Sequence, residues 1–314
     1  GGIRFGTDFS VRPDLITQPL PDFVGSVAVP TGIDIIVNDR RVQSADVRPG
    51  EFTVRSVPVP FGRNEVGVVV EDALGRETFQ SVPFYSSRRL LAPGLVEGAI
   101  NIGAIRRRYG VASNDYGSLG ISGMARRGIT RRLTLTAMGE AGKGVANVGM
   151  GADFVVADIA VVSATARTST STDAVGVSRT GSLLSAGIES SGRGFSISLE
   201  GRKVSRHFAD LASANGDTVP QSLLAANFNF DLADYGKVQF SAIRQWQVSA
   251  PSRDIAAKRV DVISASYRKQ LGRNFSFSFD VANRNNGGRS EWSALFGLSI
   301  SLGHRRFAQS SYSR

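Results

Sequence analysis

Cysteine is absent from this sequence, with 0 among 314 residues. Its absence excludes disulfide bonds, thiolate metal sites and cysteine nucleophiles. Histidine is nearly as scarce, and the 2 present are His207 and His304. A tight zinc site is therefore not expected, and the sequence predicts no cofactor and no metal site.

Long apolar runs are also lacking, since no stretch approaches the roughly 18–20 consecutive apolar residues of a transmembrane helix. Residues 1–6 lack the charged start and apolar core of a secretion signal, so we expect the chain to begin inside a larger or processed protein. Glycine, by contrast, is abundant, with 35 residues. Together with frequent serine and threonine, it favours many strands joined by turns over a helical enzyme.

Acidic residues are too few to balance the basic ones: 37 lysines and arginines stand against 27 aspartates and glutamates, which gives a net charge of +10. Arginine clusters recur near expected strand ends, at 40–41, 88–89, 106–108, 126–127, 131–132 and 305–306. Solvated turns are the favoured interpretation, and a basic pore lining or contact with lipopolysaccharide is the alternative. Nucleic-acid binding is disfavoured, because the charges do not form one block interleaved with aromatic residues.

Residues 19–87 have the pattern of a small β-domain. Turn signals separate its strand-like runs, which lie at 24–29, 33–37, 52–57, 66–71 and 77–84. Asn38-Asp39, Pro49-Gly50 and the segment 72–75 supply the turns. The expected structure is a β-sandwich of about 65 residues, marginally stable alone and more stable when docked.

From about residue 98 to residue 302, the sequence becomes a series of about a dozen similar segments. Each has roughly 9–12 residues, the length that a tilted strand needs to cross a membrane. Phe275, Phe277 and Phe279 alternate with Ser276 and Ser278, and such a period of two excludes a helix. A soluble sandwich also alternates. Long consecutive strands with small polar residues on one side favour a membrane barrel with a wet lumen.

The fold class expected is therefore all-β, with a transmembrane antiparallel β-barrel segment and a small β-sandwich. The large apolar side chains of the alternation are expected to face lipid. The residues predicted for this face are Phe195, Ile197, Leu199, Phe228, Phe230, Phe275, Phe277, Phe279, Trp292, Phe296, Leu298 and Ile300.

The segment that joins the two regions resembles the entry into the plug domain of fimbrial ushers, the outer-membrane pores of the chaperone–usher pathway. The match is carried by residues 12–23, 25–30, 34–38, 47–52, 68–77, 83–87 and 90–95. It is closest to ushers that assemble spore-coat-U-like subunits. One departure is Glu51, which stands in Pro49-Gly50-Glu51-Phe52 where the family usually has proline. The motif and turn residues are Phe23, Asn38, Pro49, Gly50, Phe52, Asp72 and Gly75.

The resemblance implies a central usher fragment in the bacterial outer membrane. Residues 1–18 are then the barrel strand before the plug, 19–87 the plug, 88–304 barrel strands and 305–314 a short tail. The plug closes the lumen at rest, facing the lumen or the periplasm, and its hinges are Pro19, Pro21, Pro93 and Gly94. The implied partners are periplasmic chaperone–pilin complexes and outer-membrane lipid, with no nucleic acid and no small-molecule substrate.

Chemical alternatives have weak support. Gly149-Met150-Gly151 lacks the third glycine of a dinucleotide-binding loop. Ser205, His207 and Asp210 lack the motif of a catalytic triad. No enzyme is therefore predicted. The rival interpretations are a secreted or surface-anchored all-β adhesin and a simple plugged porin.

Overall fold

The computed structural model of the chain describes residues 1–12, 14–27, 31–48, 50–71, 77–106, 114–172, 175–215, 219–247, 258–272, 274–301 and 307–313. Within these residues the regular structure is almost entirely β. The helical elements in this part of the chain are single turns: η1 (Phe9–Val11), α1 (Leu211–Ala214) and η2 (Ala233–Tyr235). None of the helices described here is long and apolar enough to cross a membrane.

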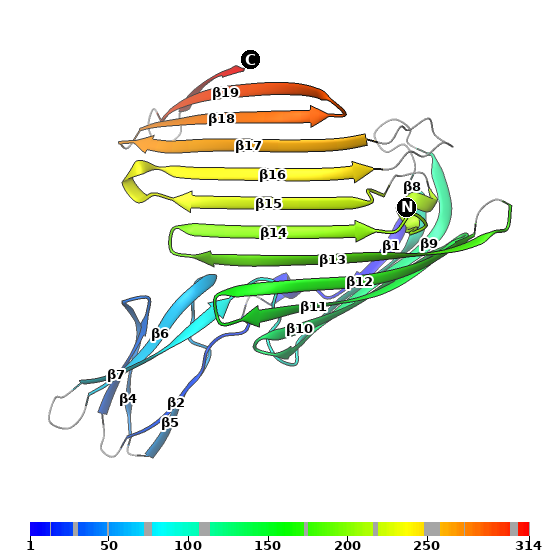
Figure 1. Ribbon diagram of the computed structural model, residues 1–314. Coiled ribbons are helices and arrows are strands. Elements are labelled where there is room, and N and C mark those ends of the chain that lie inside the picture. Colours follow the sequence, from blue (N-terminus) through cyan, green and yellow to red (C-terminus); the bar gives the residue numbers. More distant parts are fainter. Residues whose placement is uncertain are drawn as a thin grey trace.

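Fourteen strands form one antiparallel sheet, in which β1 pairs with β8 and every later strand pairs with the next along the chain (Figure 1). Its strands are β1 (Gly2–Gly6), β8 (Val96–Arg106), β9 (Tyr116–Thr130), β10 (Leu133–Gly142), β11 (Val145–Val156), β12 (Ala160–Thr172), β13 (Ser178–Gly192), β14 (Phe195–Val204), β15 (Ser222–Asp231), β16 (Lys237–Gln247), β17 (Lys258–Leu271), β18 (Phe275–Asn286), β19 (Arg289–Ser301) and β20 (Phe307–Ser313). The sheet is open, with β1 and β20 as its edges. We call it the large sheet.

Tight turns close the hairpins at one end of these strands. Gly194, between β13 and β14, has φ 77°, and Ala157 and Asp158, between β11 and β12, have φ 49° and 54°. Positive φ at such positions matches the right-handed twist of the flanking strands. We call the strand ends at the turns β9–β10, β11–β12 and β13–β14 the short-turn rim.

The small domain is built from β2 (Phe23–Val27), β3 (Thr31–Val37), β4 (Arg40–Val47), β5 (Gly50–Val54), β6 (Gly62–Glu71) and β7 (Glu77–Ser86). β2 pairs with β5, and β4-β3-β6-β7 form a second sheet. Alternate residues of these strands fill one core, in which Ile33, Ile35 and Val66 are each at most 1% exposed, and Val57, from the segment after β5, is buried among them. Because β1 and β8 are neighbours, the small domain is an insertion between two adjacent strands of the large sheet.

Figure 1 shows the small domain projecting from the short-turn rim rather than lying across the large sheet. The backbone N–H of Ala92 donates to the carbonyl of Thr17 over 2.8 Å, so the two linkers meet where they leave the sheet. The resemblance implied a plug inside a lumen at rest. The pairing of β1 with β8 places the domain between two neighbouring strands. In this structure the domain sits at a rim, and its role as a plug stays a prediction.

Three local expectations need correction. Residues 305–314 were expected to be a tail, yet β20 pairs with β19 from Leu295↔Ser313 to Ser301↔Phe307. β4 was not expected, because it presents mostly exposed residues and has no apolar alternation. Within residues 1–18, β1 covers only Gly2–Gly6, and η1 follows it.

Candidate functional site

One face of the large sheet carries all twelve residues predicted to meet lipid. Directly opposed residues of an antiparallel pair share a face, and one row of opposed residues runs through Phe195, Phe230, Val238, Tyr267, Phe279 and Phe296. Phe279 is 46% and Trp292 71% exposed. We call this surface the apolar face. Large apolar side chains with this much solvent exposure indicate a face that is covered by lipid or by another molecule.

The opposite face is lined by small polar side chains, and we call it the polar face. Asn229 Nδ2 donates to Ser196 Oγ over 3.1 Å, and Asn227 Nδ2 donates to Ser198 Oγ over 3.4 Å. The residues that form these bonds alternate along β14 and β15 with the phenylalanines of the apolar face. The strand register therefore places the predicted apolar residues on one face and the polar residues on the other, and contact of the apolar face with lipid stays a prediction.

A segment between β14 and β15, residues 205–215, folds over the polar face. The backbone N–H of Leu211 donates to Glu140 Oε2 over 3.2 Å, and that of Ala209 donates to Ser169 Oγ over 3.0 Å. Glu140 also receives a hydrogen bond from Arg167 over 2.9 Å. Arg167 in turn lies 5.7 Å from the ring centre of Phe208. The segment narrows the space above the polar face at the end of the strands away from the short-turn rim.

Two sequence features permit this fold of residues 205–215. Gly181 lies under Phe208, where an added Cβ would come within 2.1 Å of the Phe208 backbone nitrogen. Asp210 caps α1 by accepting from the N–H of Ser213 over 2.7 Å, and Ser213 Oγ accepts from the N–H of Asp210. Asp210 is a preferred N-cap residue, and this local signal for the short helix was not among the predictions from the sequence.

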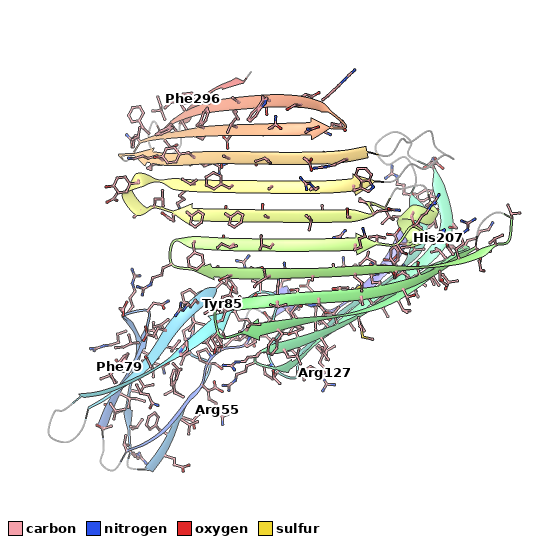
Figure 2. All side chains as sticks on the ribbon, in the orientation of Figure 1. Arg55, Phe79, Tyr85, Arg127, His207 and Phe296 are labelled. Atoms are coloured by element: carbon pink, nitrogen blue, oxygen red, sulfur yellow. The ribbon has the colours of Figure 1, made fainter. Side chains whose placement is uncertain are left out.

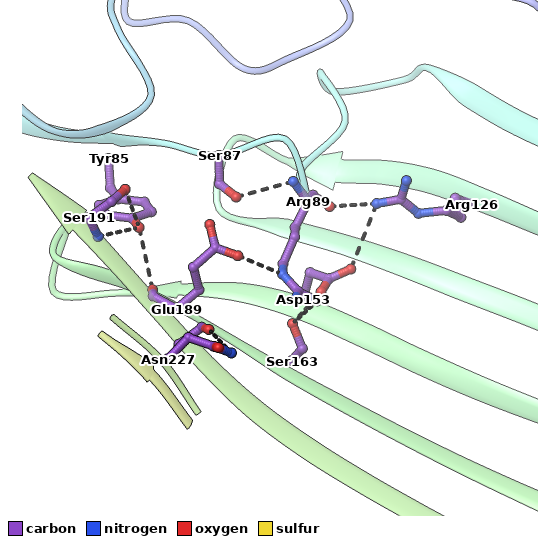
Figure 3. Close-up of polar contacts among 10 residues, drawn as sticks. Tyr85, Ser87, Arg89, Arg126, Asp153, Ser163, Glu189, Ser191 and Asn227 are labelled. Atoms are coloured by element: carbon purple, nitrogen blue, oxygen red, sulfur yellow. Dashed lines mark hydrogen bonds and ion pairs between the residues drawn. The ribbon is translucent and has the colours of Figure 1, made fainter. Parts of the chain in front are cut away.

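The junction between the small domain and the large sheet is anchored by Tyr85 (Figures 2 and 3). Tyr85 is 2% exposed and packs with Leu90, Val155 and Val161. Its hydroxyl accepts from the N–H of Ser191 over 3.1 Å and donates to the carbonyl of Glu189 over 3.3 Å. Burial raises the pKa of this hydroxyl above its ordinary value. The junction therefore combines a buried apolar contact with a satisfied polar group.

Charged pairs surround this anchor. Arg89 Nε lies 3.0 Å from Glu189 Oε2, and Arg193 lies 3.0 Å from Asp39 of the small domain. Arg126 donates to the carbonyl of Arg89 over 2.6 Å, as Figure 3 shows, and Arg131 pairs with Asp22. Several arginines of the clusters seen in the sequence thus have acidic partners at turns and at the junction.

The predicted plug-motif residues have mainly structural roles in the small domain. Phe23 and Phe52 pack against its core. Asn38, in the β3–β4 turn with φ 51°, donates to Asn64 over 2.8 Å and accepts from the N–H of Glu65 over 3.0 Å. Gly50 has φ 122°, which favours glycine. Pro49, Asp72 and Gly75 lie outside the described residues.

The predicted hinge residues lie in or beside hydrogen-bonded segments. Pro19 and Pro21 are buried, and the carbonyl of Pro21 accepts from the N–H of Val57 over 3.1 Å. Pro93 is exposed. Gly94, with φ 84°, donates from its N–H to the carbonyl of Gly128 over 2.9 Å. Their role as hinges stays a prediction.

The chemical alternatives gain nothing from the fold. Gly149 and Gly151 lie within strand β11 rather than in a loop. Ser205 Oγ accepts from the N–H of Ser182, and Asp210 caps α1, so both have structural partners. Across the part of the chain that the structure describes, no group of three or more His, Cys, Asp or Glu residues could hold a metal ion.

Comparison with known proteins identifies the fold. No protein-family model and no curated protein sequence matches the chain. Among solved structures, the P pilus usher PapC translocation pore matches with a TM-score of 0.53 and 16% identity over 100% of this chain and 63% of that one. The chain has the fold of part of an usher pore. PapC in an E. coli P pilus tip assembly intermediate with PapD, PapK and PapG gives a TM-score of 0.67 at 17% identity, over 99% of this chain and 39% of PapC.

The usher fold accounts for the topology described above. The chain spans about 63% and 39% of the two PapC chains that it matches. At such low identity the likeness concerns the fold alone.

The residues that sequence reasoning missed are those of the junction, because Tyr85, Glu189 and Arg193 are far apart in the sequence and no local pattern links them.

Proposed function

We propose that this chain is the central segment of an outer-membrane usher, which translocates and assembles pilus subunits delivered by a periplasmic chaperone. The observation that carries the proposal is the large sheet with one apolar and one polar face, in the fold of a PapC pore. A bilayer covers the apolar face, and the polar face lines an aqueous passage. Backbone groups in hydrocarbon must be hydrogen-bonded. In the membrane, the free edges of β1 and β20 are therefore paired as well, as parts of a closed barrel.

No catalytic step is needed for this function, and we propose none. Each subunit exchanges the strand borrowed from its chaperone for the N-terminal extension of the next subunit, which is a β-strand addition. The usher contributes proximity, orientation and an exit. Residues 205–215, which lie on the polar face, reduce the width of the passage on one side.

We further propose that the small domain gates the passage, moving between the lumen and the rim position described above. The composition of the junction supports such a movement. Its charged pairs are exposed, with 66% and 86% exposure for Arg193 and Asp39, and exposed pairs contribute only about 0.2–1 kcal/mol each. The buried contacts of Tyr85 hold the rim position, and they are few enough to be replaced by contacts inside a lumen.

Planar-bilayer conductance tests the gating. The full-length protein is compared with a variant in which residues 20–86 are replaced by a short glycine–serine bridge. Because Thr17 and Ala92 are hydrogen-bonded to each other, the bridge need not strain the sheet. The expected result is a higher resting conductance in the deleted protein. Equal conductance, with both proteins folded, contradicts the gating.

Subunit export tests translocation separately. Cells carrying the chaperone and pilins but lacking the usher are complemented with the full-length gene, and surface pili are counted. Restoration supports the usher function. A porin would restore small-solute uptake without pili, and an adhesin would be recovered in soluble form without detergent.

A further inference from the structure

The apolar face is hollowed where four neighbouring strands carry small residues. Ala152, Ala164, Ala186 and Gly201 oppose one another in sequence across β11, β12, β13 and β14. They line a hollow of about 1330 Å³, whose walls include Leu135, Met150 and Leu184. A second hollow of about 650 Å³ shares Ala186, Gly201, Leu224 and Arg244 with the first. The two form one apolar groove across the strands.

Cations border this groove at the end of the strands away from the short-turn rim. Lys203 is opposed to Leu184, and Arg244 is opposed to Leu224, so both lie on the apolar face. Both are exposed, and both line the larger hollow. Lys203 and Arg244 belong to none of the arginine clusters in the sequence, whereas Arg127, of the cluster at 126–127, lines the larger hollow nearer the short-turn rim.

A carboxylate organises this corner without neutralising it. Asp261 lies 2.8 Å from Arg244 Nε and 2.8 Å from Arg259 Nη2. Lys203, Arg244 and Arg259 carry three positive charges against the single negative charge of Asp261. Trp246, 42% exposed, is opposed to Ser222, which is itself opposed to Lys203. Tryptophan is enriched at the membrane–water interface, where an apolar ring meets polar headgroups.

We propose that this corner of the apolar face binds an outer-membrane lipid with a phosphate-bearing, acidic headgroup. Its acyl chains lie in the groove over Ala186 and Gly201, and its headgroup contacts Lys203 and Arg244. Positive charge on a surface that faces lipid is unfavourable unless the side chains reach an interface or an anion, and anionic headgroups attract such residues. A second copy of the chain is a poor occupant, because its own cationic corner would add repulsion. The inference rests on the membrane placement in the proposed function.

The test is lipid retention by the full-length protein in a non-ionic detergent, measured by native mass spectrometry. Phosphatidylglycerol is compared with phosphatidylcholine of the same acyl chains. The wild type is expected to retain phosphatidylglycerol preferentially. The double variant Lys203→Gln/Arg244→Gln is expected to lose at least about tenfold in that preference, since both basic side chains attract an anionic headgroup.

Arg284→Gln is the matched control, because Arg284 is exposed at the same end of the sheet but on the polar face, opposed to Val262 and Glu291. It is expected to leave the preference unchanged. Ala186→Leu fills the groove and is expected to reduce retention of both lipids while the preference persists. Heat-modified gel mobility verifies that each variant is folded.

Equal retention of the two lipids by the wild type overturns the proposal, and so does an equal loss in the Arg284→Gln protein. Displacement of the lipid by millimolar inorganic phosphate alone also overturns it, since the site is then an anion site. If the wild type is a dimer and the double variant is a monomer, the apolar face binds a second copy of the chain instead. Pilus assembly is scored independently, so lipid retention without export overturns the usher function and leaves the lipid site standing.

Discussion

The small domain and the large sheet use the same alternation of apolar and polar residues, with opposite outcomes. In the small domain, alternate residues such as Ile35 pack into a shared core and are 1% exposed. In the large sheet, Leu199, Phe279 and Phe296 are between 42% and 48% exposed. Alternation by itself therefore does not reveal what covers the apolar side. A second sheet supplies the cover in one region, and we propose that lipid supplies it in the other.

The largest expected effect concerns the core of the small domain. Ile35→Ala leaves a cavity beside Val57 and Val66, and we expect a loss of about 2–5 kcal/mol in the stability of that domain. Hydrogen exchange of the β3 and β6 amides in the full-length protein measures it. Val24→Ala serves as the control, because Val24 is exposed. An equal loss in both variants would mean that the domain has no specific core.

The next effect concerns the apolar face of the large sheet. Leu199→Arg places a charge where we propose lipid, with a penalty of roughly 2–4 kcal/mol at the bilayer midplane. Ser198→Arg places the same charge on the polar face, where it meets water. Folding efficiency into lipid vesicles, read from heat-modified gel mobility, should fall for Leu199→Arg only. Equal sensitivity at the two positions would remove the distinction between the faces.

A smaller effect concerns the junction between the two regions. Tyr85→Phe removes the acceptor of the Ser191 N–H and the donor to the Glu189 carbonyl. A buried group left without its partner costs about 1–3 kcal/mol, so the small domain should leave the rim more often. Spin labels at Arg55→Cys and Lys143→Cys report this as a broader distance distribution. Tyr235 is exposed, so the control Tyr235→Phe should leave the distribution unchanged. An unchanged distribution in Tyr85→Phe would mean that Tyr85 does not hold the small domain at the rim.

The smallest effect concerns the charged pairs around that anchor. A double-mutant cycle of Arg193→Ala and Asp39→Ala should give a coupling energy of only about 0.2–1 kcal/mol. The coupling should shrink further in high salt, because exposed charges are screened. The fraction of molecules with the small domain at the rim, measured for the wild type, the two single variants and the double variant, gives the coupling energy. A coupling above about 2 kcal/mol would mean that charge, and not Tyr85, holds the domain.

The large sheet was predictable from the sequence because its signal is local. The period of two fixes which residues share a face, and Phe275, Phe277 and Phe279 do share one face. The similar lengths of the segments indicated that they form one long series of strands. The pairing order also followed, because strands that are consecutive in the sequence are usually neighbours in an antiparallel sheet.

The remaining features depend on contacts between distant residues. β20 was missed because Phe307–Ser313 has no clear alternation, and its strand state follows from pairing with β19. Tyr85 meets Ser191 across 106 positions, and residues 205–215 meet Glu140 across 71. No local pattern encodes these contacts. The rim position of the small domain depends on them and could not be predicted.

Cysteine labelling of β18 tests the two-faced sheet most directly, because the chain has no cysteine of its own. Single cysteines are introduced at positions 275 to 280 of the full-length protein in lipid, and a spin label on each reports access to oxygen and to a water-soluble nickel chelate. We predict that Phe275→Cys, Phe277→Cys and Phe279→Cys favour oxygen, whereas Ser276→Cys, Ser278→Cys and Asp280→Cys favour the chelate. Loss of this alternation, or labels at 275, 277 and 279 shielded from both reagents, would contradict a lipid-facing apolar surface.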